Sequence, residues 1–189
     1  LGMGMTITAC YIFLAVLLAP SLIQAGLDPL AVHMFIMYWG MVSFITPPVA
    51  LAAFAAASVA RANPIDTGLQ AMTMGSIIYF VPCFFILNPS LVLQGSFLEF
   101  VLHFITALIG IVLVCAALQG YIGRIGDLRR CGSLEWPIRV SLFVGGLLFA
   151  APGGGLMPLS SFQMTAAAVA LSLPALAVAW ICARRSAAT

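Results

Sequence analysis

Charged side chains are almost absent from this sequence. Only 6% of its 189 residues are Asp, Glu, Lys or Arg, whereas a soluble globular domain has roughly 25%. So few charges cannot cover a water-facing surface, and 63% of the residues are hydrophobic. The composition therefore excludes a soluble protein and predicts an all-α integral membrane protein, a polytopic helix bundle in a lipid bilayer.

Lysine is missing altogether. The seven basic residues are all arginine, against five acidic residues, and the formal net charge is only +2. No basic tract interleaved with aromatic residues occurs, so the sequence predicts no nucleic-acid partner.

Residues that carry chemistry are equally sparse in the apolar runs. The cysteines are scattered, without Cys-x-x-Cys or Cys/His ligand spacing, at Cys10, Cys83, Cys115, Cys131 and Cys182. This spacing predicts neither a transition-metal site nor a disulfide framework. No Ser/His/Asp or paired-carboxylate arrangement lies within the apolar runs, so we expect neither an enzyme nor a bound cofactor.

Glycine, proline and charged residues divide the chain into six apolar segments, and a bilayer core takes about 20 residues as a helix. The segments are expected at 7–25, 30–61, 69–94, 97–123, 137–151 and 165–183. The second is too long for one straight span, so we expect two half-helices at 30–44 and 49–61.

Local signals predict how two of these segments begin and bend. Asp28 is expected to cap the second segment, and Asp66 or Thr67 the third. Pro82 is expected to kink the third segment, which should end near Asn88.

Arginine placement predicts the orientation, because cytoplasmic loops collect basic residues. The arginines follow the second and sixth segments and flank the loop between the fourth and fifth: Arg61, Arg124, Arg129, Arg130, Arg139, Arg184 and Arg185. The opposite loops, around 26–29, 88–96 and 152–164, contain no basic residue. We therefore expect a cytoplasmic C-terminus. The first segment is then either an ordinary span or the returning arm of a re-entrant hairpin.

The most informative stretch reads FITPPVALAAFAAASVA, at residues 44–60. Pro47 and Pro48 break a helix where no water is available to satisfy freed backbone groups. One interpretation is a plain kink whose freed groups are satisfied by a neighbouring helix. The other is a cation site, because broken helices in secondary transporters use freed oxygens to hold Na⁺.

The oxygens for such a site come from four consecutive residues. They are the carbonyls of Phe44 and Ile45 and the hydroxyls of Ser43 and Thr46. A second candidate is LGMGMT at the start of the chain, where Gly2 and Gly4 allow unusual backbone conformations and Thr6 adds a hydroxyl. Small residues also permit ordinary helix packing, so this stretch is a weak signal by itself.

Together these stretches resemble a known family. The residues that carry the likeness read GMGMTITACYIFLAVLLAPSLIQAGLDPLAVHMFIMYWGMVSFITPPVALAAFAAASVARANPIDTGLQA, followed by YFVPCFFILNPSLVLQG. They resemble the large membrane subunit of tripartite ATP-independent periplasmic (TRAP) transporters, over residues 1–95. The closer likeness is to the fused form that works with a TAXI-type periplasmic binding protein. The family tip often reads GMGMPTTA, where this chain has GMGMTITA.

The resemblance implies the second inverted repeat of an elevator-type transporter. Residues 1–95 would form its transport core, with a hairpin tip at 1–6, a returning arm at 7–25, a broken helix at 30–61 and a helix at 69–94. Residues 96–189 would be C-terminal transmembrane helices. The hairpin tip and the break at Ser43–Pro48 would together form a Na⁺ site beside the substrate pocket.

The implied function is Na⁺-coupled import of organic acid anions across the bacterial inner membrane. A periplasmic binding protein would deliver the substrate, and the missing N-terminal half of the same permease would supply the first repeat. The alternative is a non-transporting membrane scaffold or assembly subunit with proline-kinked helices.

Overall fold

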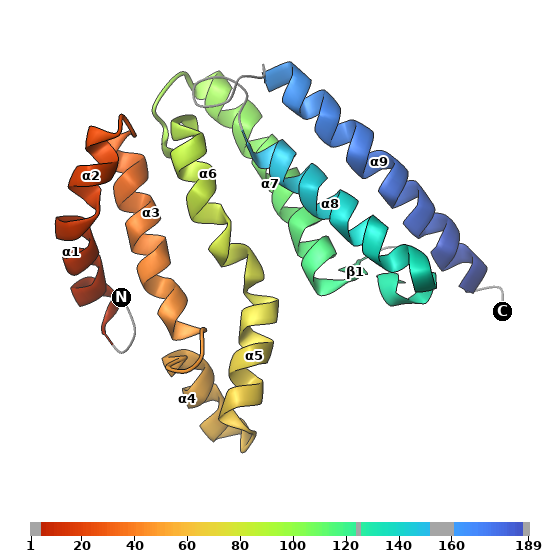
Figure 1. Ribbon diagram of the computed structural model, residues 1–189, viewed down its shortest axis with the longest axis horizontal. Coiled ribbons are helices and arrows are strands. Elements are labelled where there is room, and N and C mark those ends of the chain that lie inside the picture. The colour runs from red at the N-terminus through yellow and green to blue at the C-terminus, as the bar shows by residue number, and fades with distance from the viewer. Residues whose placement is uncertain (1–4, 124–125, 152–160, 187–189) are drawn as a thin grey trace. The chain divides into compact units, whose positions relative to one another are not determined.

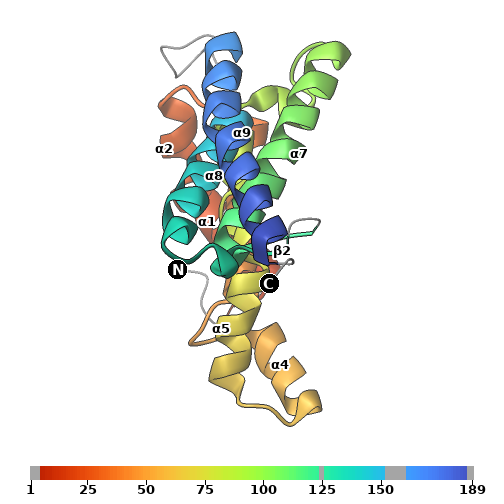
Figure 2. The same cartoon turned by 90° about the vertical axis from the view of Figure 1, so that its right-hand side faces the viewer.

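The computed structural model describes residues 5–123, 126–151 and 161–186. The chain divides into two compact units, Leu1–Ser96 and Phe97–Thr189. Within each unit the described elements are almost entirely helical (Figures 1 and 2). The fold is an all-α membrane helix bundle, as the sequence predicts.

The first unit consists of short helices separated by breaks. Its elements are α1 (Ile7–Leu17), α2 (Ala19–Gln24), α3 (Pro29–Met41), the 3₁₀ helix η1 (Val42–Phe44), α4 (Leu51–Ala60), α5 (Pro64–Met74), η2 (Ser76–Tyr79), α6 (Val81–Leu87) and η3 (Pro89–Val92).

The second unit consists of three longer helices and a small connecting ribbon. Its elements are α7 (Phe97–Gln119), β1 (Tyr121–Ile122), β2 (Gly126–Asp127), η4 (Leu128–Leu134), α8 (Glu135–Ala150) and α9 (Ser161–Ser186). The two strands are antiparallel and pair Tyr121 with Asp127.

Side chains next to prolines start two helices of the first unit. Asp28 caps α3, as predicted, because its Oδ1 accepts a hydrogen bond of 2.9 Å from the Ala31 N–H. The prediction that Asp66 or Thr67 caps the third segment is wrong. The helix begins one turn earlier, where Asn63 Oδ1 accepts from the Ile65 N–H at 2.9 Å.

The third segment bends by 69° between α5 and the η2–α6 stretch. The bend falls at Gly75, which ends α5, and not at Pro82. Pro82 lies in the first turn of α6, where a missing N–H costs nothing because the first N–H groups of a helix have no partner within it. The helix ends at Leu87, with Asn88 at its C-cap, as expected.

Two described helices are long and apolar enough to cross a membrane, Phe97–Gln119 and Phe162–Arg184. The bent pair Pro64–Met74 and Ser76–Leu87 forms a third if it is one span. Shorter apolar helices are Ile7–Leu17, Pro29–Phe44 and Leu51–Ala60. These lengths fit a first unit built from half-helices.

Helix α1 packs against α3 in the first unit, as the first view shows (Figure 1). The helices run in opposite directions, and Gly40 near the end of α3 faces Cys10 near the start of α1. A Cβ added to Gly40 would lie 3.3 Å from Cys10 Sγ. The start of α1 and the end of α3 therefore lie at the same end of this pair.

Helices α7, α8 and α9 pack side by side in the second unit. Glycines let α7 and α8 approach closely, because a Cβ added to Gly110 would lie 2.5 Å from the Gly146 carbonyl oxygen. The C-terminal end of α7, the start of α8 and the C-terminal end of α9 share one end of this unit (Figure 1). Arg129, Arg139 and Arg184 all lie at that end.

Candidate functional site

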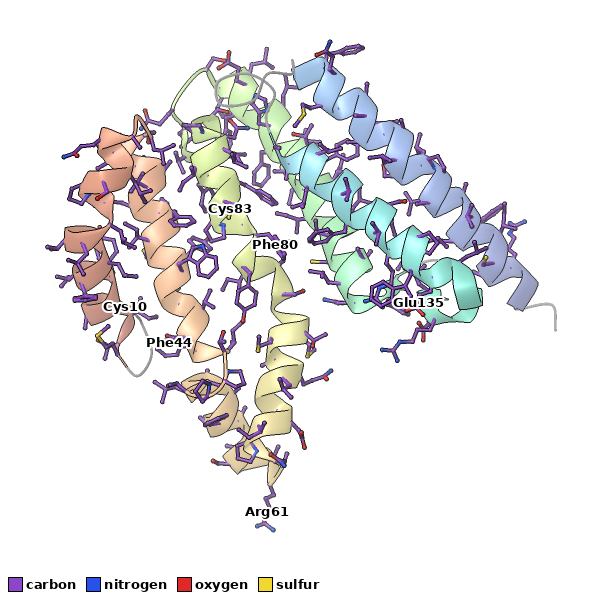
Figure 3. The ribbon with its side chains drawn as sticks, viewed as in Figure 1. Cys10, Phe44, Arg61, Phe80, Cys83 and Glu135 are labelled. Atoms are coloured by element: carbon purple, nitrogen blue, oxygen red, sulfur yellow. The ribbon has the colours of Figure 1, made fainter. Side chains whose placement is uncertain are left out.

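The broken helix is the feature from which the site is built. Helix α3 gives way to η1, the chain turns through Pro47 and Pro48, and α4 begins at Leu51. The peptide bond between the two prolines is cis. Figure 3 labels Phe44 at this turn.

The proline pair explains which carbonyls lose their helical partners. In an α-helix the N–H of a residue bonds the carbonyl four residues earlier. Pro47 and Pro48 have no N–H, so the carbonyls of Ser43 and Phe44 lack an α-helical donor. Beyond the pair the chain recovers, because the Ala50 N–H donates to the Thr46 carbonyl at 3.0 Å.

The two hydroxyls of the break point their protons back along α3 and η1. Ser43 Oγ donates to the Gly40 carbonyl at 3.1 Å, and Thr46 Oγ1 donates to the Val42 carbonyl at 2.8 Å. Both side chains are half-buried. Since each hydroxyl donates its proton to the backbone, at least one lone pair of its oxygen faces away from that bond and remains available as a ligand.

The residues expected at a hairpin tip divide between described and undescribed parts of the chain. Gly2 and Gly4 lie outside the described residues. Thr6 is the N-cap of α1, where its Oγ1 accepts from the Ala9 N–H at 3.3 Å. Because α1 and α3 are antiparallel, Thr6 lies at the same end of the pair as the break.

A third segment, α5 with η2, contacts the break at three successive places. A Cβ added to Gly68 would lie 2.8 Å from Pro47 Cγ, and one added to Gly75 would lie 2.9 Å from Ile45 Cδ1. The Tyr79 hydroxyl lies 2.7 Å from Thr46 Oγ1. Sequence reasoning missed all of these contacts, because the paired residues lie 21 to 33 positions apart along the chain and share no motif with the proline pair.

The start of α4 is also unusual. Ala50 is buried and adopts the left-handed conformation at φ +37°. This turn directs the chain into α4, whose first N–H groups have no partners within the helix and carry the positive end of its dipole. Such a helix start favours an anion.

The break itself carries no ionisable side chain between Ser43 and Pro48. Among residues 5–123, 126–151 and 161–186, no group of three His, Cys, Asp or Glu side chains comes together. The chemistry of the site is therefore that of neutral oxygens, which suits a hard monovalent cation better than a transition metal.

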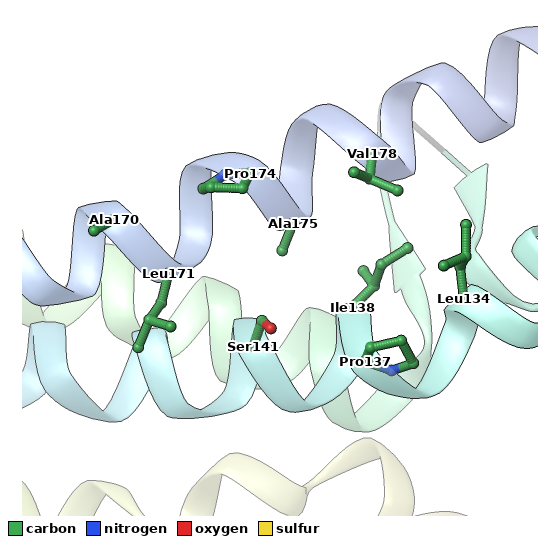
Figure 4. Close-up of a pocket in the computed structure, with 9 residues that line it drawn as sticks. All are labelled: Leu134, Pro137, Ile138, Ser141, Ala170, Leu171, Pro174, Ala175 and Val178. Atoms are coloured by element: carbon green, nitrogen blue, oxygen red, sulfur yellow. The ribbon is translucent and has the colours of Figure 1, made fainter.

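A hollow lies elsewhere, in the second unit. It has a volume of about 300 Å³ and lies between α8 and α9, around Pro174. Figure 4 shows its lining, which is apolar apart from Ser141. A hollow with one hydroxyl offers no set of converging polar groups, so it is not the candidate site.

Residues 1–119 match the family profile described as the tripartite ATP-independent periplasmic transporter, DctM component. The matched region includes the whole break, the start of α1 and the α5–η2 segment. The comparisons with curated proteins and with solved structures gave no match.

Proposed function

The chain belongs to the tripartite ATP-independent periplasmic transporter family, as its DctM component, and from this premise we propose that it imports organic acid anions by coupling them to Na⁺. The family is one of transporters, not enzymes, and its members are multi-pass membrane proteins that take substrate from a periplasmic binding protein. We further propose that the binding protein is of the TAXI type and that the membrane is the bacterial inner membrane.

One observation carries the Na⁺ proposal: the broken helix presents oxygens without any carboxylate. The carbonyls of Ser43 and Phe44 have no α-helical donor, and the Ser43 and Thr46 hydroxyls use their protons on the backbone. Oxygen clusters of this kind at a broken helix hold Na⁺ in secondary transporters. Gly2, Gly4 and Thr6 of the hairpin tip, together with the Ile45 carbonyl, complete the proposed ligand set.

The anion proposal is supported by the same break. The N–H groups at the start of α4 have no partners within the helix, and no acidic residue lies in its first turn. A half-helix N-terminus is the group that secondary transporters direct at a substrate carboxylate. A cation on the α3 side and an anion on the α4 side would neutralise each other across the turn.

The orientation proposal is supported by the second unit. Arg129, Arg139 and Arg184 lie at the end where α7 and α9 finish and α8 begins. Since the cytoplasmic loops of membrane proteins are enriched in basic residues, we propose that this end and the C-terminus are cytoplasmic.

The test of the Na⁺ site is Thr46→Ala in the complete transporter, reconstituted into vesicles with its binding protein. The variant loses one proposed ligand, so the Na⁺ concentration for half-maximal uptake should rise at least about tenfold. The matched control is Thr73→Ala on α5, whose exposed hydroxyl donates only to the Leu69 carbonyl. If Thr46→Ala leaves uptake and its Na⁺ dependence unchanged, the break is not the Na⁺ site.

A further inference from the structure

The hydrogen bonds of Thr46 assign a direction to the contact with Tyr79. Thr46 Oγ1 lies 2.8 Å from the Val42 carbonyl, which only accepts, so the threonine proton is used there. The Tyr79 hydroxyl, 2.7 Å from the same oxygen, must then be the donor. Two contacts thus fix the Thr46 hydroxyl, and one lone pair remains free in a defined direction.

Tyr79 is itself held in place. Its ring packs edge-on against Trp39, with the ring centroids 6.3 Å apart. Gly75, at the start of η2, lies against Ile45, and Gly68 on α5 lies against Pro47. The break and the α5–η2 segment therefore form one packed surface, on which Tyr79 is aimed at Thr46.

Ser76, also on η2, has a hydroxyl that the packing does not explain. Within the described part of the chain its Oγ is buried and has no hydrogen-bond partner. Leaving a buried hydroxyl unsatisfied costs about 1–3 kcal/mol. Residues three apart in a 3₁₀ helix eclipse one another, so Ser76 and Tyr79 lie on the same side of η2.

We propose that the broken helix forms one side of the cation site and that η2 forms the other. Tyr79 is a positioning residue, which orients the free lone pair of Thr46, and Ser76 Oγ is a further oxygen ligand. This inference rests on the proposed Na⁺ site and extends it to residues outside the broken helix. The ligand chemistry is a monovalent hard cation, because no charged side chain joins the cluster and every donor atom is a neutral oxygen.

The test uses Tyr79→Phe and Ser76→Ala in the complete transporter, with Na⁺-dependent uptake in vesicles as the first readout. Each variant should raise the half-saturating Na⁺ concentration roughly three- to tenfold while leaving the maximal rate close to that of the wild type. The controls are Tyr38→Phe, whose ring packs against Phe85, and Ser58→Ala, whose exposed hydroxyl donates to the Phe54 carbonyl. Neither control should change the Na⁺ dependence.

The double variant separates positioning from packing. In the Thr46→Ala background the hydroxyl that Tyr79 orients is gone, so Tyr79→Phe should produce no further change in half-saturation. Equal effects in both backgrounds would overturn the positioning role. If Thr46→Ala alone is without effect, the Na⁺ site itself fails; if Thr46→Ala acts but Tyr79→Phe and Ser76→Ala do not, only the role of η2 fails.

A second measurement follows the melting temperature of the purified transporter in detergent, in NaCl and in KCl. A bound ligand raises the melting temperature of the folded state. Ser76→Ala removes an unsatisfied buried hydroxyl, so it should melt at or above the wild-type temperature in KCl and yet lose much of the Na⁺-induced increase. A full Na⁺-induced increase in Ser76→Ala would overturn its assignment as a ligand.

Discussion

Arg139 shows how one side chain of this protein can complete the end of another helix. Its Nε donates to the Ala117 carbonyl at 2.7 Å, and a terminal nitrogen donates to the Leu118 carbonyl at 2.8 Å. Its other terminal nitrogen pairs with Glu135 at 2.8 Å. The last carbonyls of a helix have no internal partner and carry the negative end of the dipole, so the guanidinium satisfies and neutralises the end of α7. The sequence assigned this arginine only to a cytoplasmic loop.

The thiol of Cys131 lies in η4, outside the membrane-spanning helices. Burial, the neighbouring Cys182 and the Glu135 carboxylate raise the pKa of the Cys131 thiol from 9.0 to about 11. A raised pKa leaves less thiolate at any given pH, so we expect iodoacetamide to alkylate Cys131 about a hundredfold more slowly at pH 8 than an ordinary cysteine. The rate should rise about tenfold per pH unit and level off only near pH 11.

Peptide mass spectrometry of the folded protein measures this rate for Cys131 separately from the other cysteines. The unfolded protein in denaturant is the control, and there the rate should level off near pH 9, the usual value. The raised pKa also makes the free energy of unfolding depend on pH. The contribution of Cys131 is fully present below pH 9, its unfolded pKa, and is lost as the pH rises toward 11. A rate in the folded protein that levels off below pH 9 would contradict the prediction.

At the scale of the element, the break at the two prolines could be predicted from the sequence, whereas the bend at the glycine could not. Pro47 and Pro48 placed the two half-helices within about two residues of α3–η1 and α4, since proline removes a donor wherever it stands. Gly75 gives no comparable signal, because glycine is tolerated inside many helices. Its bend becomes understandable only beside Ile45, where a larger residue would collide.

Gly110 controls the approach of α7 to α8. An added Cβ would lie 2.5 Å from the Gly146 carbonyl oxygen, a backbone atom that moves only if the helices separate. We expect Gly110→Ala to destabilise the second unit by about 1–3 kcal/mol. Thermal unfolding of the purified protein in detergent, followed by circular dichroism, measures the effect.

Gly123→Ala is the matched control for that substitution. A Cβ added to Gly123 has no atom within 4 Å, so this variant should unfold at the wild-type temperature. If the two variants unfold at the same temperature, the α7–α8 interface is loose enough to accept a methyl group and the glycine contact is not required.

At the scale of the whole molecule, the sequence predicted the class and the broken helix but not the neighbours of the break. Membrane composition follows from the scarcity of charge, and the break follows from adjacent prolines. The Thr46–Tyr79 contact joins positions 33 residues apart, and it depends on the 69° bend and on two glycines that let α5 approach. No local rule connects such residues, so the α5–η2 side of the candidate site required the structure.

The distribution of charge predicts the orientation of the whole chain in the membrane. All seven arginines follow or flank the segment ends that we assign to the cytoplasm, and the loop at 88–96 contains no basic residue.

Alkaline phosphatase is active only in the periplasm, whereas green fluorescent protein exported by the general secretory pathway does not fluoresce there. Fusions made after Ala62 and after Thr189 should therefore fluoresce and lack phosphatase activity, while a phosphatase fusion after Gly95 should be active. The fusion after Gly95 is the internal control for membrane insertion, since only the side of the membrane differs between it and the other two. Phosphatase activity at Thr189 would reverse the orientation of α9, and the arginines at its end would then require an explanation other than retention in the cytoplasm.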